Sequence, residues 1–215
     1  MNFELARTNM VKSQVLPNKV NGEHLLASLM QTPRESFVDD SYRDFAYSDM
    51  VIPLPKHQRS MLKPLQSARL IEALNLSPGN RVMVLGAGRG YEAAVLAGMG
   101  MQVFAVEENA DLVAEGKSLT PPEVQWKQGD ISNGWPEESP FDGVLIAGGV
   151  ARVPNKAIGQ LGKKGRLAAI VHVPNQPLMR ALLMVGIAGG DRPDYMFETM
   201  APYLPGWQPE TPFEI

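Results

Sequence analysis

The sequence predicts an α/β protein built on a doubly wound, mostly parallel sheet. Three observations support this prediction. Strand-like and helix-like segments alternate after residue 80, a glycine-rich turn joins the first of these strands to a helix, and two strand-like segments end the chain. Alternation of strands and helices produces parallel strands with crossover helices on both faces of the sheet. The last two segments instead indicate an antiparallel pair, which is unusual in dinucleotide-binding folds.

The hydrophobic patterns place the elements of the sheet. Strands are expected at residues 81–85, 102–106, 124–127, 141–147, 166–172, 178–187 and 194–199. Helices are expected at residues 90–98, 110–118 and 154–161. Residues 188–191, Ala-Gly-Gly-Asp, are expected to form the turn between the last two strands.

The N-terminal part reads as helical. Residues 2–16 form a predicted amphipathic helix, whose apolar side would carry Phe3, Leu5, Ala6, Met10, Val11 and Val15. Asn21 is expected to cap a second helix that carries Leu25, Leu26, Leu29 and Met30. Residues 49–64 are rich in proline and have no clean period, so we expect irregular structure there, followed by a third helix at 65–74.

Composition excludes several classes of protein. The net charge of −3 provides no basic field for holding nucleic acid. The absence of cysteine excludes disulfides, thiolate catalysis and zinc-thiolate sites, and the three histidines are too scattered to predict a metal site. Neither a signal-peptide pattern nor an apolar run of membrane-spanning length is present. The expected location is the cytoplasm.

The glycine-rich turn is the most informative motif. An apolar run ending at Leu85 leads into Gly86-Ala87-Gly88-Arg89-Gly90-Tyr91. Glycines at a strand-to-helix turn allow a ligand to approach the backbone closely. The spacing is G-x-G-x-G, and Tyr91 stands where the third glycine of a dinucleotide fingerprint would fall. A bound pyrophosphate is therefore disfavoured.

An acidic residue completes the pattern. Glu107 ends the next predicted strand, about 20 residues after the turn, where an acid accepts hydrogen bonds from ribose hydroxyls. A ribose-binding acid without the phosphate spacing favours S-adenosylmethionine, which has a ribose and no phosphate. The alternative is a surface turn with an unrelated, exposed glutamate.

Across nearly all its length the chain resembles the protein-L-isoaspartate (D-aspartate) O-methyltransferase family. The resemblance rests on the glycine turn with Tyr91 and on motifs spread over the chain. These motifs are Pro33-Arg34-Glu35-Ser36-Phe37-Val38, Tyr47-Ser48-Asp49, Gly129-Asp130, Gly134-Trp135-Pro136-Glu137-Glu138, Pro140-Phe141-Asp142 and Gly165-Arg166-Leu167. Residues 201–207, Ala-Pro-Tyr-Leu-Pro-Gly-Trp, are similar to a divergent bacterial branch of the family.

The resemblance implies a Rossmann-like methyltransferase fold: a seven-stranded sheet with an antiparallel C-terminal pair. Residues 1–64 would form a helical cap with a substrate-side loop, and residues 65–215 the methyltransferase domain, in one compact unit. The implied cofactor is S-adenosylmethionine. The implied reaction is protein repair, in which the α-carboxylate of an isoaspartyl residue in a damaged protein is methylated. The partners would be protein or peptide substrates, and the chain a monomer or homodimer.

The segment that holds the substrate departs from the family. The family reads Gly-Gln-Thr-Ile-Ser-Gln-Pro there, and its serine contacts the substrate carboxylate. Counting back from Pro64 places Leu62 at that serine and Ser60 at the threonine. Three alternatives remain for the missing serine hydroxyl. Ser60 could replace it as hydrogen-bond donor after a local shift, Arg59 or Lys63 could supply a positive charge for the carboxylate, or the activity could be lost. His57 matches a family histidine; Ser60, Arg59 and His57 are the candidate catalytic residues.

The cofactor side also departs. Val84 stands where the family carries an acid, and Ile131 follows Asp130 where the family has glycine. By resemblance, the Asp130 carboxylate would accept from the adenine amino group and Ile131 would pack on the ring. The candidate cofactor-binding residues are Gly86, Ala87, Gly88, Gly90, Tyr91, Glu107, Asp130 and Ile131.

Three other functions remain open. A non-catalytic relative that acts through protein contacts is favoured by Leu62 and Val84. A methyltransferase with another acceptor would use Arg59 to recognise a different anion. A nicotinamide-dependent oxidoreductase is opposed by the missing third glycine and by the antiparallel tail.

Overall fold

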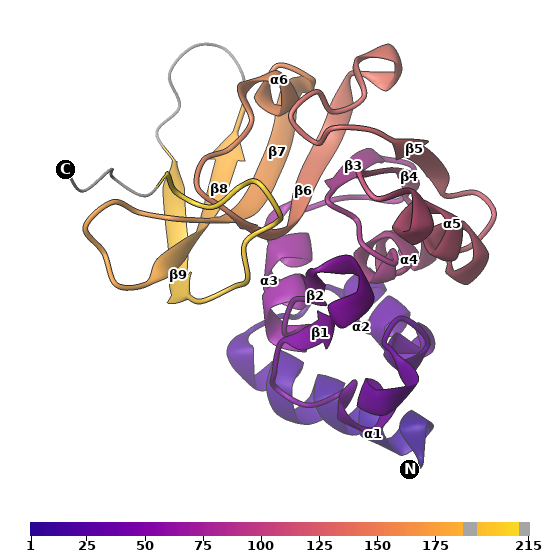
Figure 1. The fold of residues 1–215 in the computed structure, drawn as a ribbon. Helices are drawn as coiled ribbons and strands as arrows, with labels where there is room; N and C mark the ends of the chain where they lie inside the picture. The colour runs from indigo at the N-terminus through magenta and orange to yellow at the C-terminus, as the bar shows by residue number, and fades with distance from the viewer. Residues whose placement is uncertain (187–192, 211–215) are drawn as a thin grey trace.

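A computed structural model describes residues 1–186 and 193–210 of the chain. Its centre is a seven-stranded sheet with the strand order β5-β4-β3-β6-β7-β8-β9 (Figure 1). The strands are β3 (Arg81–Leu85), β4 (Gln102–Glu107), β5 (Gln125–Gln128), β6 (Phe141–Val150), β7 (Leu161–Val171), β8 (Met179–Val185) and β9 (Asp194–Thr199). Pairing is parallel from β5 to β7, and β8 pairs antiparallel with both β7 and β9. The predicted sheet and its antiparallel tail are confirmed, while the turn predicted at 188–191 lies outside the described residues.

Four helices follow the alternating pattern. They are α3 (Pro64–Ala73), α4 (Tyr91–Gly98), α5 (Ala110–Leu119) and α6 (Asn155–Ile158). The helix expected at 154–161 is wrong in length, because Leu161 pairs with Phe141 and already belongs to β7. Strand β6, predicted to end at residue 147, continues to Val150.

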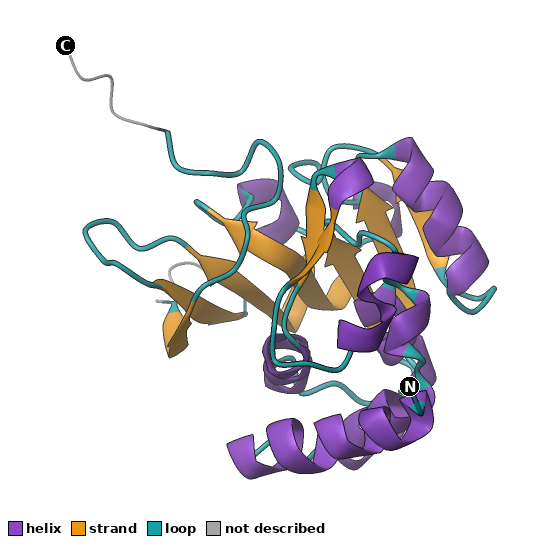
Figure 2. Ribbon diagram, turned by 60° about the horizontal axis from the view of Figure 1, so that its bottom comes forward, coloured by secondary structure: helices purple, strands orange, loops and turns teal. Residues whose placement is uncertain are grey.

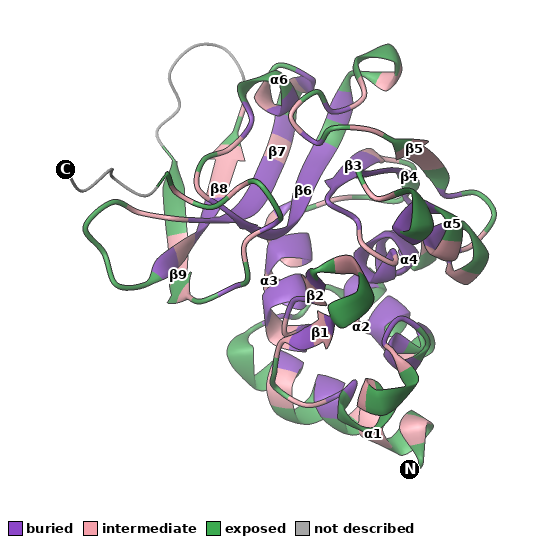
Figure 3. Ribbon diagram, viewed as in Figure 1, coloured by how far each residue is buried: buried purple, intermediate pink, exposed green. Residues whose placement is uncertain are grey.

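Alternate residues of each central strand face opposite sides of the sheet, as the two-residue period requires. In β3, Val82 and Val84 belong to a core cluster shared with the N-terminal helices, α3 and α4. Met83 and Leu85 belong to a second cluster on the other face, together with Ala157 of α6 and Leu204. The central strands are largely buried (Figure 3).

The N-terminal helices lie along one side of the sheet (Figure 2). Helix α1 (Phe3–Met10) continues into a π-helical turn (Val11–Val15) and a 3-10 turn (Leu16–Asn18). Met10 is buried, whereas Leu5 is 56% exposed. The prediction for Leu5 is wrong because it stands five residues before Met10, about 140° around an α-helix.

The second helix, α2 (Glu23–Gln31), begins one residue later than predicted. Its N-cap is Gly22, and Asn21 makes no side-chain capping bond. The backbone N–H groups of Asn21 and Gly22 instead donate to Oε1 of Glu72, at 2.6 and 2.9 Å. The N-terminus of α2 is thus capped by the Glu72 carboxylate of α3 and not by the side chain of Asn21. A negative charge is favourable there because the N-terminus is the positive end of the helix dipole.

The proline-rich segment is more ordered than predicted. It folds into a small antiparallel sheet of β1 (Ile52–Leu54) and β2 (Arg59–Met61), joined by a 3-10 turn (Pro55–His57). Gln58, with a φ of 51°, makes the left-handed step that reverses the chain. Arg59 is consequently fixed in a strand.

One core cluster contains Val15 and Leu29 from the N-terminal part as well as Ile170 from the sheet. The predicted division of the chain at residue 64 stays a prediction. Among the helices of residues 1–186 and 193–210, none has the length and apolar character needed to span a membrane.

Candidate cofactor site

The glycine turn and Glu107 lie at the carboxyl ends of adjacent parallel strands. Gly86 and Gly88 follow β3 with φ values of 66° and 57°, which L-residues with side chains rarely adopt. Glu107 ends β4 and is 0% exposed. Its Oε2 accepts from the Gly88 N–H at 2.9 Å, and its Oε1 accepts from the Asn109 N–H at 3.1 Å. Glu107 is therefore hydrogen-bonded to the glycine turn, while its predicted role in binding a ribose stays a prediction.

Arg59 occupies the remaining open side of this carboxylate. Its Nη2 donates to Oε2 of Glu107 at 2.5 Å, and both side chains are buried. Three donors therefore surround a carboxylate that has about four acceptor positions. The Nη1 atom of Arg59 is buried and has no hydrogen-bond partner among the described residues. Arg59 thus occupies the carboxylate for which the sequence predicts a ribose partner.

Leu204 covers the turn itself. A Cβ atom added to Gly86 would lie 2.7 Å from Cδ1 of Leu204, and one added to Gly148 of β6 would clash with the same side chain. Leu204 is 4% exposed. The space that the glycines leave open on this side of the turn is filled by leucine.

What remains beside the turn is a cavity of about 10 Å³. That volume suits one water molecule, whereas ligand pockets usually measure about 300–1,000 Å³. The cavity is lined by Phe37, Leu54, Ser60, Met61, Gly86, Ala87, Gly88, Arg89, Tyr91, Glu92 and Ala147.

The last two residues of the motif face the core. A Cβ on Gly90 would lie 2.7 Å from Cζ2 of Trp126, so this glycine makes room for an indole. The buried ring of Tyr91 packs edge-on against Phe37 at 5.6 Å and beneath the guanidinium of Arg34 at 4.6 Å. Burial raises the pKa of the Tyr91 hydroxyl. Tyr91 and Gly90 therefore pack against the protein core.

Asp130 and Ile131 follow β5, next to a larger hollow. Asp130 is exposed and accepts from the N–H and Oγ of Ser132 at 2.7 and 2.6 Å. The Ser132 hydroxyl holds the pKa of this carboxyl below its usual value. Ile131 is buried, and its N–H donates to Oε1 of Glu108 at 3.2 Å. The hollow measures about 750 Å³ and is lined by Glu108, Gln128, Gly129, Asp130, Ser132, Ala151, Arg152, Pro205, Gly206, Trp207, Gln208 and Glu210.

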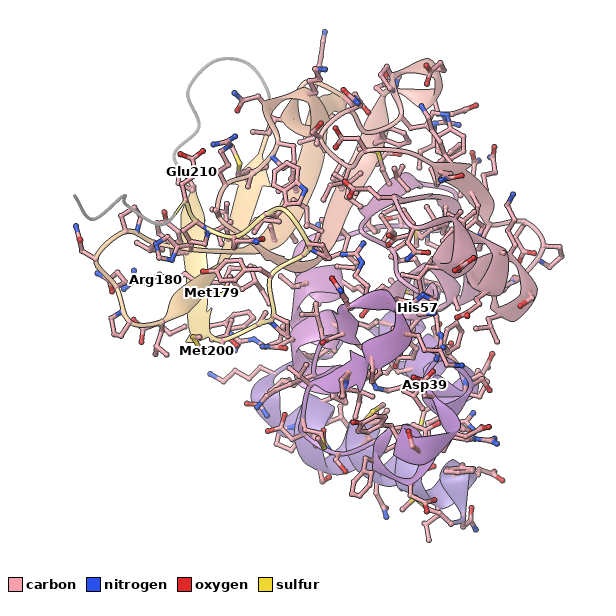
Figure 4. The ribbon with its side chains drawn as sticks, viewed as in Figure 1. Asp39, His57, Met179, Arg180, Met200 and Glu210 are labelled. Atoms are coloured by element: carbon pink, nitrogen blue, oxygen red, sulfur yellow. The ribbon has the colours of Figure 1, made fainter. Side chains whose placement is uncertain are left out.

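Of the candidate catalytic residues, the structure brings Ser60 and Arg59 to the turn and leaves His57 at its rim. Ser60 lines the small cavity from β2. His57 lies with its Nε2 3.3 Å from Oε1 of Glu115 on α5. Figure 4 shows His57 and Asp39 on the same side of the molecule. Leu62 is buried in a core cluster, and its carbonyl accepts from Arg34.

The sequence reasoning missed a charged cluster at this rim. Arg89, inside the glycine turn, donates through Nε to Glu115 at 2.5 Å and through Nη2 to Asp39 at 2.6 Å. Burial alone would lower the pKa of the Arg89 guanidinium, but the hydrogen bonds to the two carboxylates outweigh it and raise the pKa. The sequence contained one indication of this cluster, namely an arginine, Arg89, inside the glycine motif. The cluster ties the turn to α5 and to the N-terminal part.

The sequence model of one family, described as Protein-L-isoaspartate(D-aspartate) O-methyltransferase, matches residues 7–183. The chain belongs to this family. A protein-L-isoaspartate O-methyltransferase of Methylorubrum extorquens is 40% identical over 182 residues, covering 81% of this chain and 78% of that protein. A second one, from Pelobacter propionicus, is 34% identical over 203 residues, covering 93% and 88% of the two chains.

Solved structures agree with the family. A protein-L-isoaspartate O-methyltransferase with 25% identity superposes with a TM-score of 0.79; the match covers 94% of this chain and 65% of that one. A Plasmodium falciparum structure assigned to the same enzyme type, in complex with S-adenosyl-L-homocysteine, has 19% identity and a TM-score of 0.71. It covers 94% of this chain and 97% of its own and supports the fold.

S-adenosylmethionine is the cofactor of this methyltransferase family. The residues beside the glycine turn do not fit it in the conformation described. The carboxylate of Glu107 is closed by Arg59, and the face of Gly86 is covered by Leu204. The cavity that Gly86 and Gly88 line is about 10 Å³. Binding of the family's cofactor beside the glycine turn would therefore require Arg59 and Leu204 to move.

Proposed function

We propose that this protein transfers a methyl group from S-adenosylmethionine to the α-carboxylate of L-isoaspartyl residues in damaged proteins. The observation that carries the proposal is the family match over residues 7–183. The juxtaposition of the glycine turn and Glu107 at adjacent strand ends supports it, since this arrangement suits a nucleoside with a free ribose. The relatives named above carry the same activity in their names.

The chemistry asks little of protein side chains. An α-carboxyl group has a pKa of about 3.5 and is ionised at neutral pH, so no general base is required. What the protein has to supply is alignment of the reacting atoms and exclusion of water, which together account for much of the rate enhancement in such transfers. A hydrogen-bond donor to the acceptor carboxylate completes the requirement.

We assign that donor to Ser60. Its side chain lines the cavity beside Gly86 and Gly88, and among the described residues its hydroxyl makes no hydrogen bond. Arg59 reaches an acceptor carboxylate only by leaving Glu107. For His57 we propose a positioning role, because its Nε2 lies 3.3 Å from Oε1 of Glu115, whose other oxygen pairs with Arg89. Asp130, which lines the larger hollow, remains our candidate for the adenine end. Ile131 remains a candidate as well, although its side chain is buried in a core cluster and does not line the hollow.

We further propose that the substrate is reached in the cytoplasm. The cysteine-free composition fits a reducing compartment, and the net charge of −3 offers no basic field for nucleic acid. A monomer or a homodimer would serve equally, because the candidate site is assembled from one chain.

The test uses the full-length protein and methyl-tritiated S-adenosylmethionine. Two synthetic peptides of identical sequence, one with L-isoaspartate and one with L-aspartate at a single position, serve as substrate and matched control. We expect base-labile methyl ester on the isoaspartyl peptide and none on its isomer. Equal labelling of both, or labelling of neither by a preparation shown to bind the cofactor, refutes the proposed acceptor.

A further inference from the structure

The segment that closes the cofactor site is formed by residues 200–207, called the C-terminal segment below. It leaves the edge strand β9 and turns back across the sheet toward β6 (Figure 1). Figure 4 labels Met200 at its start and Glu210 beyond its end. Residues 201–207 of this segment are the stretch whose sequence is similar to a divergent bacterial branch of the family.

Backbone hydrogen bonds hold the segment on the carboxyl end of β6. The Gly149 N–H donates to the Pro202 carbonyl at 2.8 Å, and the Leu204 N–H donates to the Gly149 carbonyl at 2.8 Å. The Ala151 N–H donates to the Trp207 carbonyl at 2.6 Å. The segment therefore lies on β6 as a short added strand, with an isolated parallel bridge at Gly149.

A tight turn presents Leu204. The Trp207 N–H donates to the Leu204 carbonyl at 2.9 Å, and Pro205 and Gly206 stand between them. Gly206 has a φ of 77°, as the third residue of a type II turn requires. The side chain of Leu204 consequently lies against Gly86 and Gly148, and Trp207 lines the larger hollow.

Arg59 closes the same site beside Leu204, since a Cβ on Gly86 would also lie 3.5 Å from Nη2 of Arg59. Its buried guanidinium pairs with Glu107, yet Nη1 has no partner among the described residues. A buried charged donor without a partner destabilises the conformation that contains it. The closed site thus combines a well-packed leucine with an incompletely satisfied arginine, which is suited to opening and not to permanent sealing.

We propose that the C-terminal segment is an intramolecular competitor of S-adenosylmethionine. Leu204 occupies the face of the glycine turn and Arg59 occupies the ribose-binding carboxylate, so the cofactor and the closed segment exclude each other. Opening would remove one wall of the larger hollow and join it to the space beside Gly86. The inference rests on the cofactor of the proposed function but not on its methyl acceptor.

The first test measures S-adenosylmethionine binding by calorimetry, without any acceptor. When only the open fraction binds, the apparent Kd exceeds the intrinsic Kd by the inverse of that fraction. Leu204→Ala removes the competing side chain, so we expect its Kd to fall by about tenfold or more relative to the unaltered protein. The matched control is Leu182→Ala in β8, because Leu182 and Leu204 are each 4% exposed and lie in one core cluster. Its Kd should stay within about twofold of the unaltered protein.

The second test needs no variant. Saturating S-adenosylmethionine should accelerate hydrogen exchange at the Leu204 and Ala151 amides, which are bonded only while the segment is closed. Amides in the middle of β6, such as Val144, should keep their protection and serve as the internal control.

Each outcome decides the proposal. An unchanged Kd in Leu204→Ala, or cofactor binding with no change in exchange at Leu204, overturns it. Absence of binding to both proteins at millimolar cofactor overturns it too, because something other than this segment then excludes the ligand. If Leu204→Ala binds tightly but methylates no isoaspartyl peptide, the competitor stands and the proposed acceptor falls. If the unaltered protein methylates the peptide while the amides of the C-terminal segment stay protected, the proposed acceptor is supported and the proposed competition is wrong.

Discussion

Arg59 and Glu107 form a buried ion pair, with Nη2 of the arginine 2.5 Å from Oε2 of the glutamate. The two residues come from different parts of the chain, a small N-terminal sheet and the central sheet. Their environments differ: Glu107 also accepts from two backbone N–H groups, whereas Arg59 Nη1 has no partner among the described residues. Removing one partner therefore has consequences different from removing the other.

We predict that Glu107→Gln destabilises the protein more than Arg59→Met does. The glutamine leaves the buried guanidinium without a charged partner, and its NH₂ group faces at least one backbone N–H donor, at a cost of about 3 kcal/mol or more. The methionine fills the space of the arginine, and the carboxylate keeps the Gly88 and Asn109 N–H groups, so about 1–2 kcal/mol is expected. Urea unfolding at pH 7 measures both free energies.

A matched control for this comparison is Glu198→Gln. Glu198 pairs with Arg180 at 3.0 Å, but its side chain is exposed, so the unfolding midpoint should hardly move. An Arg59→Met variant less stable than Glu107→Gln would contradict the assignment of Glu107 as the better satisfied partner.

A second prediction concerns alkaline pH. Burial raises the pKa of Tyr47 above its usual range, with the hydrogen bond to Glu35 adding to the shift, and burial likewise raises the pKa of Tyr91. The unfolded chain titrates these hydroxyls near pH 10, while the folded protein keeps them protonated. Between those pKa values the folded state binds more protons, so stability is complete below about pH 10 and falls as pH rises further.

Two measurements check the sign. Ultraviolet titration of the folded protein at pH 11 should show that the hydroxyls of Tyr47 and Tyr91 are still protonated. The urea concentration at the unfolding midpoint should be lower at pH 11 than at pH 9. This difference should be smaller in Tyr91→Phe than in the unaltered protein. Ionisation of all five tyrosines before unfolding would show that burial does not protect Tyr47 and Tyr91.

Ser60 provides the third prediction, which concerns the acceptor. If its hydroxyl holds the substrate carboxylate, Ser60→Ala loses a hydrogen bond to a charged group, commonly about 1.5–3 kcal/mol. The KM for an isoaspartyl peptide should then rise roughly tenfold or more, while the Kd for S-adenosylmethionine stays unchanged. Ser118→Ala on the exposed surface of α5 is the control. A KM equal to that of the control would remove Ser60 from the acceptor site.

The sheet and the turn were predictable from the sequence for a physical reason. Strand β3 was bounded correctly at Arg81–Leu85 because a continuous apolar run ends there in glycine. Consecutive parallel strands end at the same edge of a sheet, so Glu107 had to lie near the turn once both strands were placed. An apolar run that ends in glycine and the order of consecutive parallel strands are therefore sufficient to predict this part of the structure.

The closure of the site was not predictable in that way. Arg59 pairs with a residue 48 positions away, from a proline-rich segment whose small sheet has no hydrophobic period. Leu204 reaches Gly86 only because the chain turns back from β9 and bonds to Gly149. Long-range contacts of irregular segments depend on packing geometry, and no spacing rule connects Leu204 with the glycine turn.

The fourth prediction tests the packing role of the third glycine. The indole of Trp126 in β5 lies over Gly90 of the turn and Gly116 of α5, and its Nε1 donates to Thr120 Oγ1 at 3.1 Å. A methyl group on Gly116 would collide with this ring. Although alanine favours a helix over glycine by about 1 kcal/mol, overpacking costs about 1–3 kcal/mol, and we expect Gly116→Ala to lower stability.

The control for this variant is Gly129→Ala. A Cβ at Gly129 would meet its nearest neighbour, Lys127 Cε, at 3.9 Å, so stability should change little. The double variant Gly116→Ala/Trp126→Phe should show coupling, because the smaller ring relieves the collision, and its loss should be less than the sum of the two single losses. A stabilised Gly116→Ala would mean that α5 can shift away from Trp126. The inference that Trp126 packs tightly against Gly116 and Gly90 would then be wrong.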